Sequence, residues 1–246
     1  MKKYKSSIIV SIVFFIIWEA LARYIDAMYI LPSPSRIVEK IWLLREPLFL
    51  VHLPSTLLVT FIGLAISIVL GVGLAIAMSL NEKIEKAIYP IVVVTQTIPI
   101  TALAPIFVLW FGYSIWSKVV VTILITFFPI TVNLYDGLRS TKREMEELLI
   151  TYGASKRDIF IKLKFPSALP YFFSALKIAV PLSVIGAAIS EWLGSQSGLG
   201  YFSKRMMTQL DGAAVFAPIV ILSLAAVILV FIINLLENKI IKWRNE

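Results

Sequence analysis

The sequence lacks cysteine and contains a single histidine, His52. The absence of cysteine excludes disulfides, thiolate metal sites and thiol nucleophiles. A lone histidine without ligand partners nearby is far more often structural than metal-binding. The chain also contains no Gly-x4-Gly-Lys phosphate-binding loop, the motif that cradles nucleotide phosphates. We therefore expect no catalytic residue, no cofactor and no metal site.

Charged residues are scarce as well, at 15% of the chain, whereas hydrophobic residues make up 59%. Soluble domains are about 45 to 50% apolar, so this composition predicts an integral membrane protein. A spanning helix needs about 20 predominantly apolar residues. Six stretches qualify: near Ser7 to Tyr24, Pro54 to Ser79, Ile88 to Phe111, Lys118 to Leu138, Tyr171 to Leu193 and Ala213 to Leu236. We expect an all-α membrane protein of six transmembrane helices, forming a single domain over residues 1–246.

Basic residues cluster on alternate loops. The richer set comprises Lys2, Lys3, Lys5, Lys83, Lys86, the seven basic residues from Arg139 to Lys164, Lys239, Lys242 and Arg244. The poorer set comprises Arg36, Lys40, Arg45, Lys204 and Arg205. Cytoplasmic loops carry the excess of Lys and Arg, so both termini are predicted to be cytoplasmic. This distribution also explains the net charge of +8 without nucleic-acid binding, which is the weaker alternative.

A polar segment, residues 139–170, separates the fourth and fifth predicted spans. Capping-box spacing, which opens helices, occurs twice in it, at Thr141 with Glu144 and at Ser155 with Asp158. Gly153 lies where a helix would end in a left-handed residue. Two short helices are therefore predicted, with apolar residues at helical spacing: Met145, Leu148, Leu149 and Tyr152 in the first, Ile159, Phe160 and Leu163 in the second. Such apolar faces require a partner.

Glu147, the triplet Gly153-Ala154-Ser155 and Pro170 are similar to the cytoplasmic loop of permease subunits of ATP-binding-cassette importers. In that family, the loop forms coupling helices that dock in a cleft of the ATPase subunit. Leu148 and Leu149 replace the two alanines for which the loop is named, which could alter the ATPase that it fits. The resemblance implies a set of ATPase-coupling residues: Glu147, Gly153, Ala154, Ser155, Lys156, Asp158, Ile159 and Phe160.

The third predicted span carries polar residues and helix breakers at mid-membrane depth, in Thr95-Gln96-Thr97-Ile98-Pro99 and at Pro105. Proline frees backbone carbonyls, which must find partners or line a cavity. A pathway lining and a kinked packing helix are both compatible with these residues. The segment from Gln96 to Gly112 resembles the core segment of the same family, which favours the pathway. The predicted pathway residues are Gln96, Thr97, Pro99, Ser183 and Glu191. Ionisable residues within a membrane are functional candidates, although Glu191 is expected near the outer surface.

Small residues recur every four positions in the second span, which predicts close helix packing. They are Gly63, Ser67, Gly71, Ala75 and Ser79. The segment from Leu31 to Arg36 is a turn that opens a short amphipathic helix at the outer interface. Its Leu-Pro-Ser-Pro sequence resembles the subgroup that imports nitrate, sulfonates, taurine and related compounds. Glycines at 194, 198 and 200 permit a tight outer turn.

The resemblance implies a permease without its own ATPase site, in the plasma (inner) membrane. Its expected partners are a dimeric ABC ATPase subunit, an extracytoplasmic substrate-binding protein, a second permease copy in a homodimer, and lipid. The substrate stays open between small anions, such as nitrate or sulfonates, and vitamin precursors such as a thiamine pyrimidine. An ion-coupled secondary transporter or channel is the alternative, although the halves show no strong repeat. An intramembrane enzyme is least favoured, because no span holds an acid pair at catalytic spacing.

Overall fold

A computed structural model describes residues 5–27 and 29–242. Within these residues all regular secondary structure is helical and there is no strand. The elements run in the order α1 (Lys5–Ile25), α2 (Pro34–Leu43), a π-helical turn (Pro47–His52), α3 (Leu53–Leu80), α4 (Glu82–Thr95), α5 (Ile100–Phe111), α6 (Ile115–Arg139), α7 (Arg143–Thr151), α8 (Lys156–Ile159), a second π-helical turn (Phe160–Lys164), α9 (Phe165–Gly194), α10 (Leu199–Thr208) and α11 (Gly212–Ile240).

The prediction of an all-α membrane protein is confirmed. Five helical segments are long and apolar enough to cross a membrane, and a sixth span results if α4 and α5 are counted together. These two helices meet at an angle of 97°. The third predicted span is therefore a broken one, and the break falls at the residues that separate Thr95 from Ile100.

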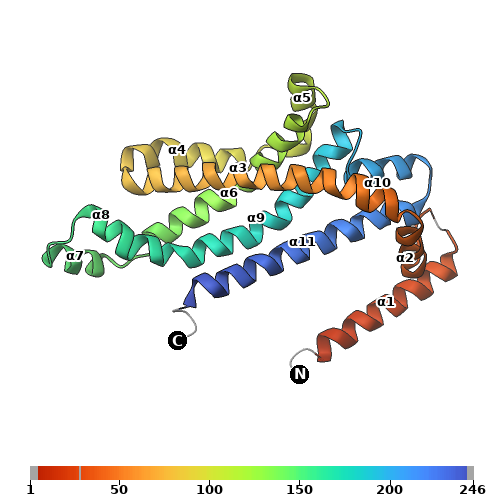
Figure 1. Ribbon diagram of the computed structural model, residues 1–246, viewed down its shortest axis with the longest axis horizontal. Helices are drawn as coiled ribbons and strands as arrows, with labels where there is room; N and C mark the ends of the chain where they lie inside the picture. Colours follow the sequence, from red (N-terminus) through yellow and green to blue (C-terminus); the bar gives the residue numbers. More distant parts are fainter. Residues whose placement is uncertain (1–4, 28, 243–246) are drawn as a thin grey trace.

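Helices α3, α6 and α9 pack side by side and form the centre of the bundle (Figure 1). Glycines bring their backbones close together. A Cβ atom added at Gly63 would lie 2.6 Å from Cγ2 of Thr122, and one at Gly71 would lie 2.8 Å from Cγ2 of Ile130. Lipid is as apolar as the side chains, so close contact of this kind holds membrane helices together. The packing role predicted for the small residues of the second span is confirmed.

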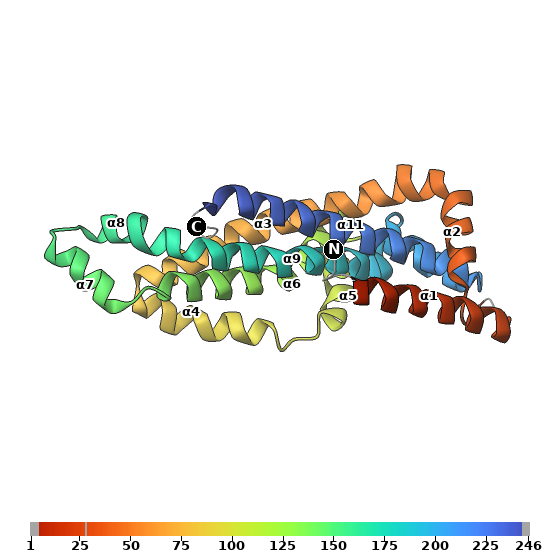
Figure 2. The ribbon, with the colours of Figure 1, turned by 90° about the horizontal axis from the view of Figure 1, so that it is seen from below.

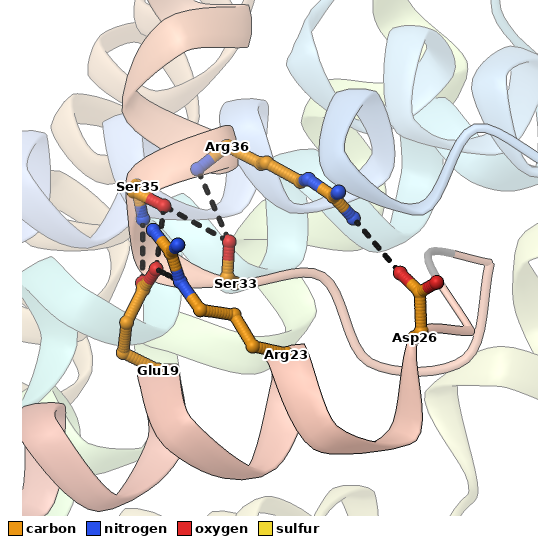
Figure 3. Close-up of polar contacts among 6 residues, drawn as sticks. All are labelled: Glu19, Arg23, Asp26, Ser33, Ser35 and Arg36. Atoms are coloured by element: carbon orange, nitrogen blue, oxygen red, sulfur yellow. Dashed lines mark hydrogen bonds and ion pairs between the residues drawn. The ribbon is translucent and has the colours of Figure 1, made fainter.

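A polar corner joins α1 to α2 (Figure 3). The carboxylate of Glu19 on α1 accepts hydrogen bonds from the backbone N–H (3.1 Å) and the hydroxyl (2.7 Å) of Ser35. Arg23 donates to the same carboxylate at 2.7 Å. Ser33 caps α2, and Pro34 is its first residue, which suits a helix start. The predicted turn and short helix are thus confirmed. The hydrogen bonds of the corner fix the orientation of α2 relative to α1.

The polar loop with α7 and α8 lies at one end of the long axis, whereas α2 and α10 lie at the other (Figures 1 and 2). At the second end, Lys40 on α2 forms an ion pair with Asp211, the cap of α11, at 2.6 Å. Burial raises the pKa of Asp211, but the Lys40 ammonium and the Ala214 N–H outweigh it and hold this pKa below its usual value. Near the first end, Lys177 of α9 pairs with Glu237 of α11. Polar contacts therefore tie the helices together at both ends.

This arrangement predicts that the two ends face opposite sides of the membrane. Single cysteines at Arg157 and Gln196, both exposed, are expected to react with a membrane-impermeant maleimide from opposite sides. The chain has no cysteine of its own, so the unsubstituted protein is the blank. Labelling of both positions from the same side in intact and inverted vesicles would contradict the six-span topology.

Candidate functional site

The polar loop contains a well-formed helix end. Gly153 follows α7 with a φ of +81°, in the left-handed region predicted for it. Its N–H donates to the carbonyl of Ile150 at 2.8 Å, and the N–H of Ala154 donates to that of Leu149 at 3.0 Å. This pair of bonds is the Schellman motif. A Cβ at Gly153 would meet nothing within 4 Å, so the backbone conformation, and not lack of space, selects glycine here.

Of the two predicted capping boxes, one is confirmed. The Ser155 hydroxyl accepts the N–H of Asp158 at 3.2 Å, and the Asp158 carboxylate accepts the N–H of Ser155 at 3.2 Å. The box predicted for Thr141 and Glu144 is wrong, because α7 is capped at Lys142, without a side-chain bond. The Thr141 hydroxyl instead donates to Glu146 at 2.9 Å.

The two halves of the loop face different surroundings. In the first helix, three of the four predicted apolar residues are exposed, Met145 by 50%, Leu148 by 49% and Tyr152 by 81%, and Leu149 is half-buried. In the second, Ile159 is only 6% exposed, and Phe160 packs against the core beside α3 and α6. The expected apolar face of the second helix therefore lies against the chain itself, and the first helix supplies the surface that is open to a partner.

Several predicted coupling residues come together around a hollow of about 290 Å³. Gly153, Ala154 and Asp158 line it, together with Leu149, Tyr152 and Lys162. Glu147 lies on the exposed side of α7 and pairs with Arg143 at 2.8 Å. Lys156 is exposed at the start of α8. The coupling role of the whole set stays a prediction.

The break between α4 and α5 exposes polar groups. Gln96, Thr97 and Pro99 are all exposed. The Thr97 hydroxyl donates to the carbonyl of Val94 at 2.8 Å, and the Thr97 N–H donates to the same carbonyl at 3.0 Å. Thr97, just beyond α4, thus satisfies the carbonyl of Val94, and an unpaired carbonyl there would be costly in an apolar medium. The predicted pathway residues of this segment are available to solute or to a second chain.

The other two predicted pathway residues lie inside the bundle. Ser183 is fully buried and donates to the carbonyl of Val180, within its own helix. Glu191 is 1% exposed although it lies in the last turn of α9, and this enclosure by protein was not predicted. Its expected place near the outer membrane surface stays a prediction. Three residues of other segments account for its burial: the side chain of Thr56 and the backbones of Gly198 and Gly200 contact its carboxylate. No local sequence signal brings these residues together.

A charged contact that the sequence did not reveal fixes the broken helix at the loop end. Arg139, the last residue of α6, donates to Glu85 of α4 and to the hydroxyl of Tyr135, both at 2.6 Å. The ring of Tyr89 in α4 also packs against that of Tyr135. The only hint in the sequence was that Glu85 and Arg139 flank predicted spans on the same side. This contact holds α4 against the end of the bundle that bears the polar loop.

Comparison with known proteins gives one family. Residues 67–242 match the family model described as the inner membrane component of binding-protein-dependent transport systems. The chain is 60% identical over 231 residues, 94% of its length and 92% of the relative's, to the formylaminopyrimidine transport permease protein of Halalkalibacterium halodurans. It is 30% identical over 216 residues, 87% and 81% of the two lengths, to the riboflavin transport system permease protein of Chloroflexus aurantiacus. A putative aliphatic sulfonates transport permease protein of Bacillus subtilis is 28% identical over 235 residues, 94% and 84% of the two lengths.

Proposed function

The chain belongs to the family of inner membrane components of binding-protein-dependent transport systems, and we propose that the solute it carries is a formylaminopyrimidine. It is a permease subunit of an ATP-binding-cassette importer. The observation that carries the substrate proposal is the 60% identity, over 94% of this chain, to a formylaminopyrimidine transport permease protein. Of the substrates considered from the sequence, this relative favours the heteroaromatic vitamin precursor over the small anions.

Coupling to ATP is proposed to occur through residues 139–170. The sequence has no phosphate-binding loop, so hydrolysis belongs to a partner ATPase, which is proposed to be dimeric. The exposed apolar residues of α7, with the adjoining hollow, have the character of a helix that docks in a groove. Ile159 and Phe160 contribute by anchoring the second half of the loop in the core. In this proposal, α7 is the helix that contacts the ATPase, and the second half of the loop is held against the core of the permease.

The translocation pathway is proposed to run past the break between α4 and α5. Exposed Gln96 and Thr97 offer hydrogen-bonding groups where the surrounding helices are apolar. Six spans enclose a poor pathway by themselves, and a second copy of the chain is proposed to complete it as a homodimer. A further proposed partner is an extracytoplasmic substrate-binding protein, which the description of the family as binding-protein-dependent supports.

Both termini are proposed to lie in the cytoplasm, with the protein in the inner membrane. The end of the molecule with α7 and α8 bears the seven basic residues from Arg139 to Lys164, as expected for a cytoplasmic face. Lys2, Lys3 and Arg244, which also entered the prediction from charge, lie outside the described residues.

Replacement of Gly153 by valine is expected to uncouple the ATPase. A β-branched residue at a φ of +81° costs about 1 kcal/mol or more in backbone strain, so the path from α7 to α8 should change. Gly153→Val is predicted to insert into the membrane normally but to retain at least tenfold less ATPase on co-purification. Gly73→Val is the matched control, because Gly73 is helical and a Cβ there meets nothing within 4 Å. If the Gly153→Val variant co-purifies with as much ATPase as the wild type, the loop is not the coupling element.

Uptake into liposomes tests the substrate and the pathway together. Vesicles that contain the permease and its ATPase, with ATP inside and binding protein outside, should accumulate radiolabelled formylaminopyrimidine, and excess taurine or nitrate should not compete. Thr97→Trp is expected to lower uptake at least tenfold with normal ATPase binding, because the indole fills the space at the break. Leu109→Trp, at an 84% exposed position of α5, serves as the control. Competition by taurine would reject the substrate, and undiminished uptake with Thr97→Trp would reject the pathway.

A further inference from the structure

A network of hydrogen bonds holds the turn after α9 together with the first two residues of α10, residues 195–200, against the start of α3. The N–H of Gly198 donates to Nδ1 of His52 at 3.1 Å, and the N–H of Leu199 donates to the hydroxyl of Thr56 at 2.8 Å. The hydroxyls of Ser55 and Ser197 lie 2.9 Å apart. Every one of these contacts joins segments more than 140 positions apart in sequence. The turn is thus hydrogen-bonded to α3 in addition to its covalent connection to α9 and α10.

Glu191 lies at the centre of this network. Its Oε2 accepts hydrogen bonds from the Thr56 hydroxyl at 3.0 Å and from the Gly200 N–H at 2.9 Å. One carboxylate oxygen therefore joins α9, which carries Glu191, to both α3 and α10. The other oxygen, Oε1, is buried and has no hydrogen-bond partner among the described residues. A buried carboxylate with half of its acceptors unused is costly, so its presence calls for a purpose beyond packing.

Gly198 leaves room for this carboxylate, and Lys118 bonds the turn that surrounds it. A Cβ at Gly198 would lie 2.1 Å from Cδ of Glu191, so the carboxylate occupies the space that a side chain would need. Gly198 also has a φ of +109°, which favours glycine. Lys118 of α6 is only 7% exposed and donates to the hydroxyl of Ser195 at 3.1 Å. A buried cation thus attaches α6 to the same turn.

The helix that carries Glu191 reaches the opposite end of the molecule. From Lys156 to Gly194 the chain is helical without interruption over 39 residues, roughly 58 Å at about 1.5 Å per residue. Its first turn, α8, belongs to the polar loop, and its last turn contains Glu191 (Figure 1). A displacement of the turn at residues 195–200 is therefore transmitted to the polar loop by one continuous helix, provided that the turn is rigidly fixed to it.

We propose that Glu191 is a positioning residue that fixes this turn to α3 and α9, so that a displacement of this end of the molecule by the external binding protein is transmitted through α9 to the ATPase. The proposal rests on the proposed function and adds to it the residue that connects the two ends. It also gives Glu191 a role other than that of a pathway lining. The hydroxyl of Thr56 is the second half of the connection, since it bonds both Glu191 and Leu199.

The test uses the assembled permease–ATPase complex in liposomes, with ATP hydrolysis measured without and with substrate-loaded binding protein. Thr56→Val removes the hydroxyl at nearly constant volume. It is expected to lower the stimulation by binding protein at least tenfold, with basal hydrolysis and ATPase co-purification within twofold of wild type. Thr56→Ser keeps the hydroxyl and is expected to restore stimulation to within twofold. Thr60→Val is the matched control, because Thr60 is equally buried on the same helix but, among the described residues, its hydroxyl bonds the carbonyl of Thr56 and no other segment.

Combining Thr56→Val with Glu191→Gln separates this role from general stability. If the two groups form one connection, the double variant should lose no more stimulation than the more severe single variant. The proposal is overturned if Thr56→Val is stimulated like wild type, if Thr56→Ser fails to rescue, or if stimulation falls only in parallel with the amount of folded complex. A wild-type complex that no binding protein stimulates would instead refute the proposed function.

Discussion

The close packing of α6 between α3 and α9 is the contact on which the rest of the structure depends. Thr122 of α6 meets two glycines: Cβ atoms added at Gly63 of α3 and at Gly186 of α9 would lie 2.6 Å from its side chain and 3.3 Å from its Cα, respectively. A third close approach joins Gly137 and Tyr171 near the loop end. In lipid, helices gain little from burying apolar surface and must associate through such fits. The two ends of the bundle are held at a fixed separation because these three helices are locked together.

Each end of this rigid centre carries a different kind of surface. At one end, the Schellman turn at Gly153 and the capping box at Ser155 orient α7 and expose its apolar side chains. At the other, the turn at residues 195–200 is bonded to α3 and to Glu191. Between them, α4 and α5 break where the polar residues Gln96 and Thr97 are exposed. In the proposed function, the continuous helix would connect the two ends, and the interrupted one would border the pathway.

Local sequence was sufficient to predict the features that depend on neighbouring residues. The membrane spans followed from composition, the left-handed Gly153 and the Ser155 cap from helix-end chemistry, and the break from Pro99. Features set by tertiary contacts were missed. Glu191 directly follows Ser190 and lies two residues before Leu193, and nothing in that sequence indicates that Thr56 and Gly200 enclose it. The contact of Phe160 with the core likewise depends on where α3 and α6 end. Thr141 is not a cap because α7 begins at Arg143, after Lys142, and its hydroxyl bonds Glu146, which also pairs with Lys164 at 3.0 Å.

The most direct measurement of the central claim, that residues 139–170 contact the ATPase, is photo-crosslinking from this loop. A benzoylphenylalanine at Tyr152, whose side chain is 81% exposed, should crosslink to the ATPase in membranes that contain both subunits. The same group at Gln196, in the turn at the opposite end, should give no ATPase adduct. A complex that retains bound ATPase, yet yields no adduct from Tyr152 or yields one from Gln196, would contradict the assignment of this loop as the site of coupling.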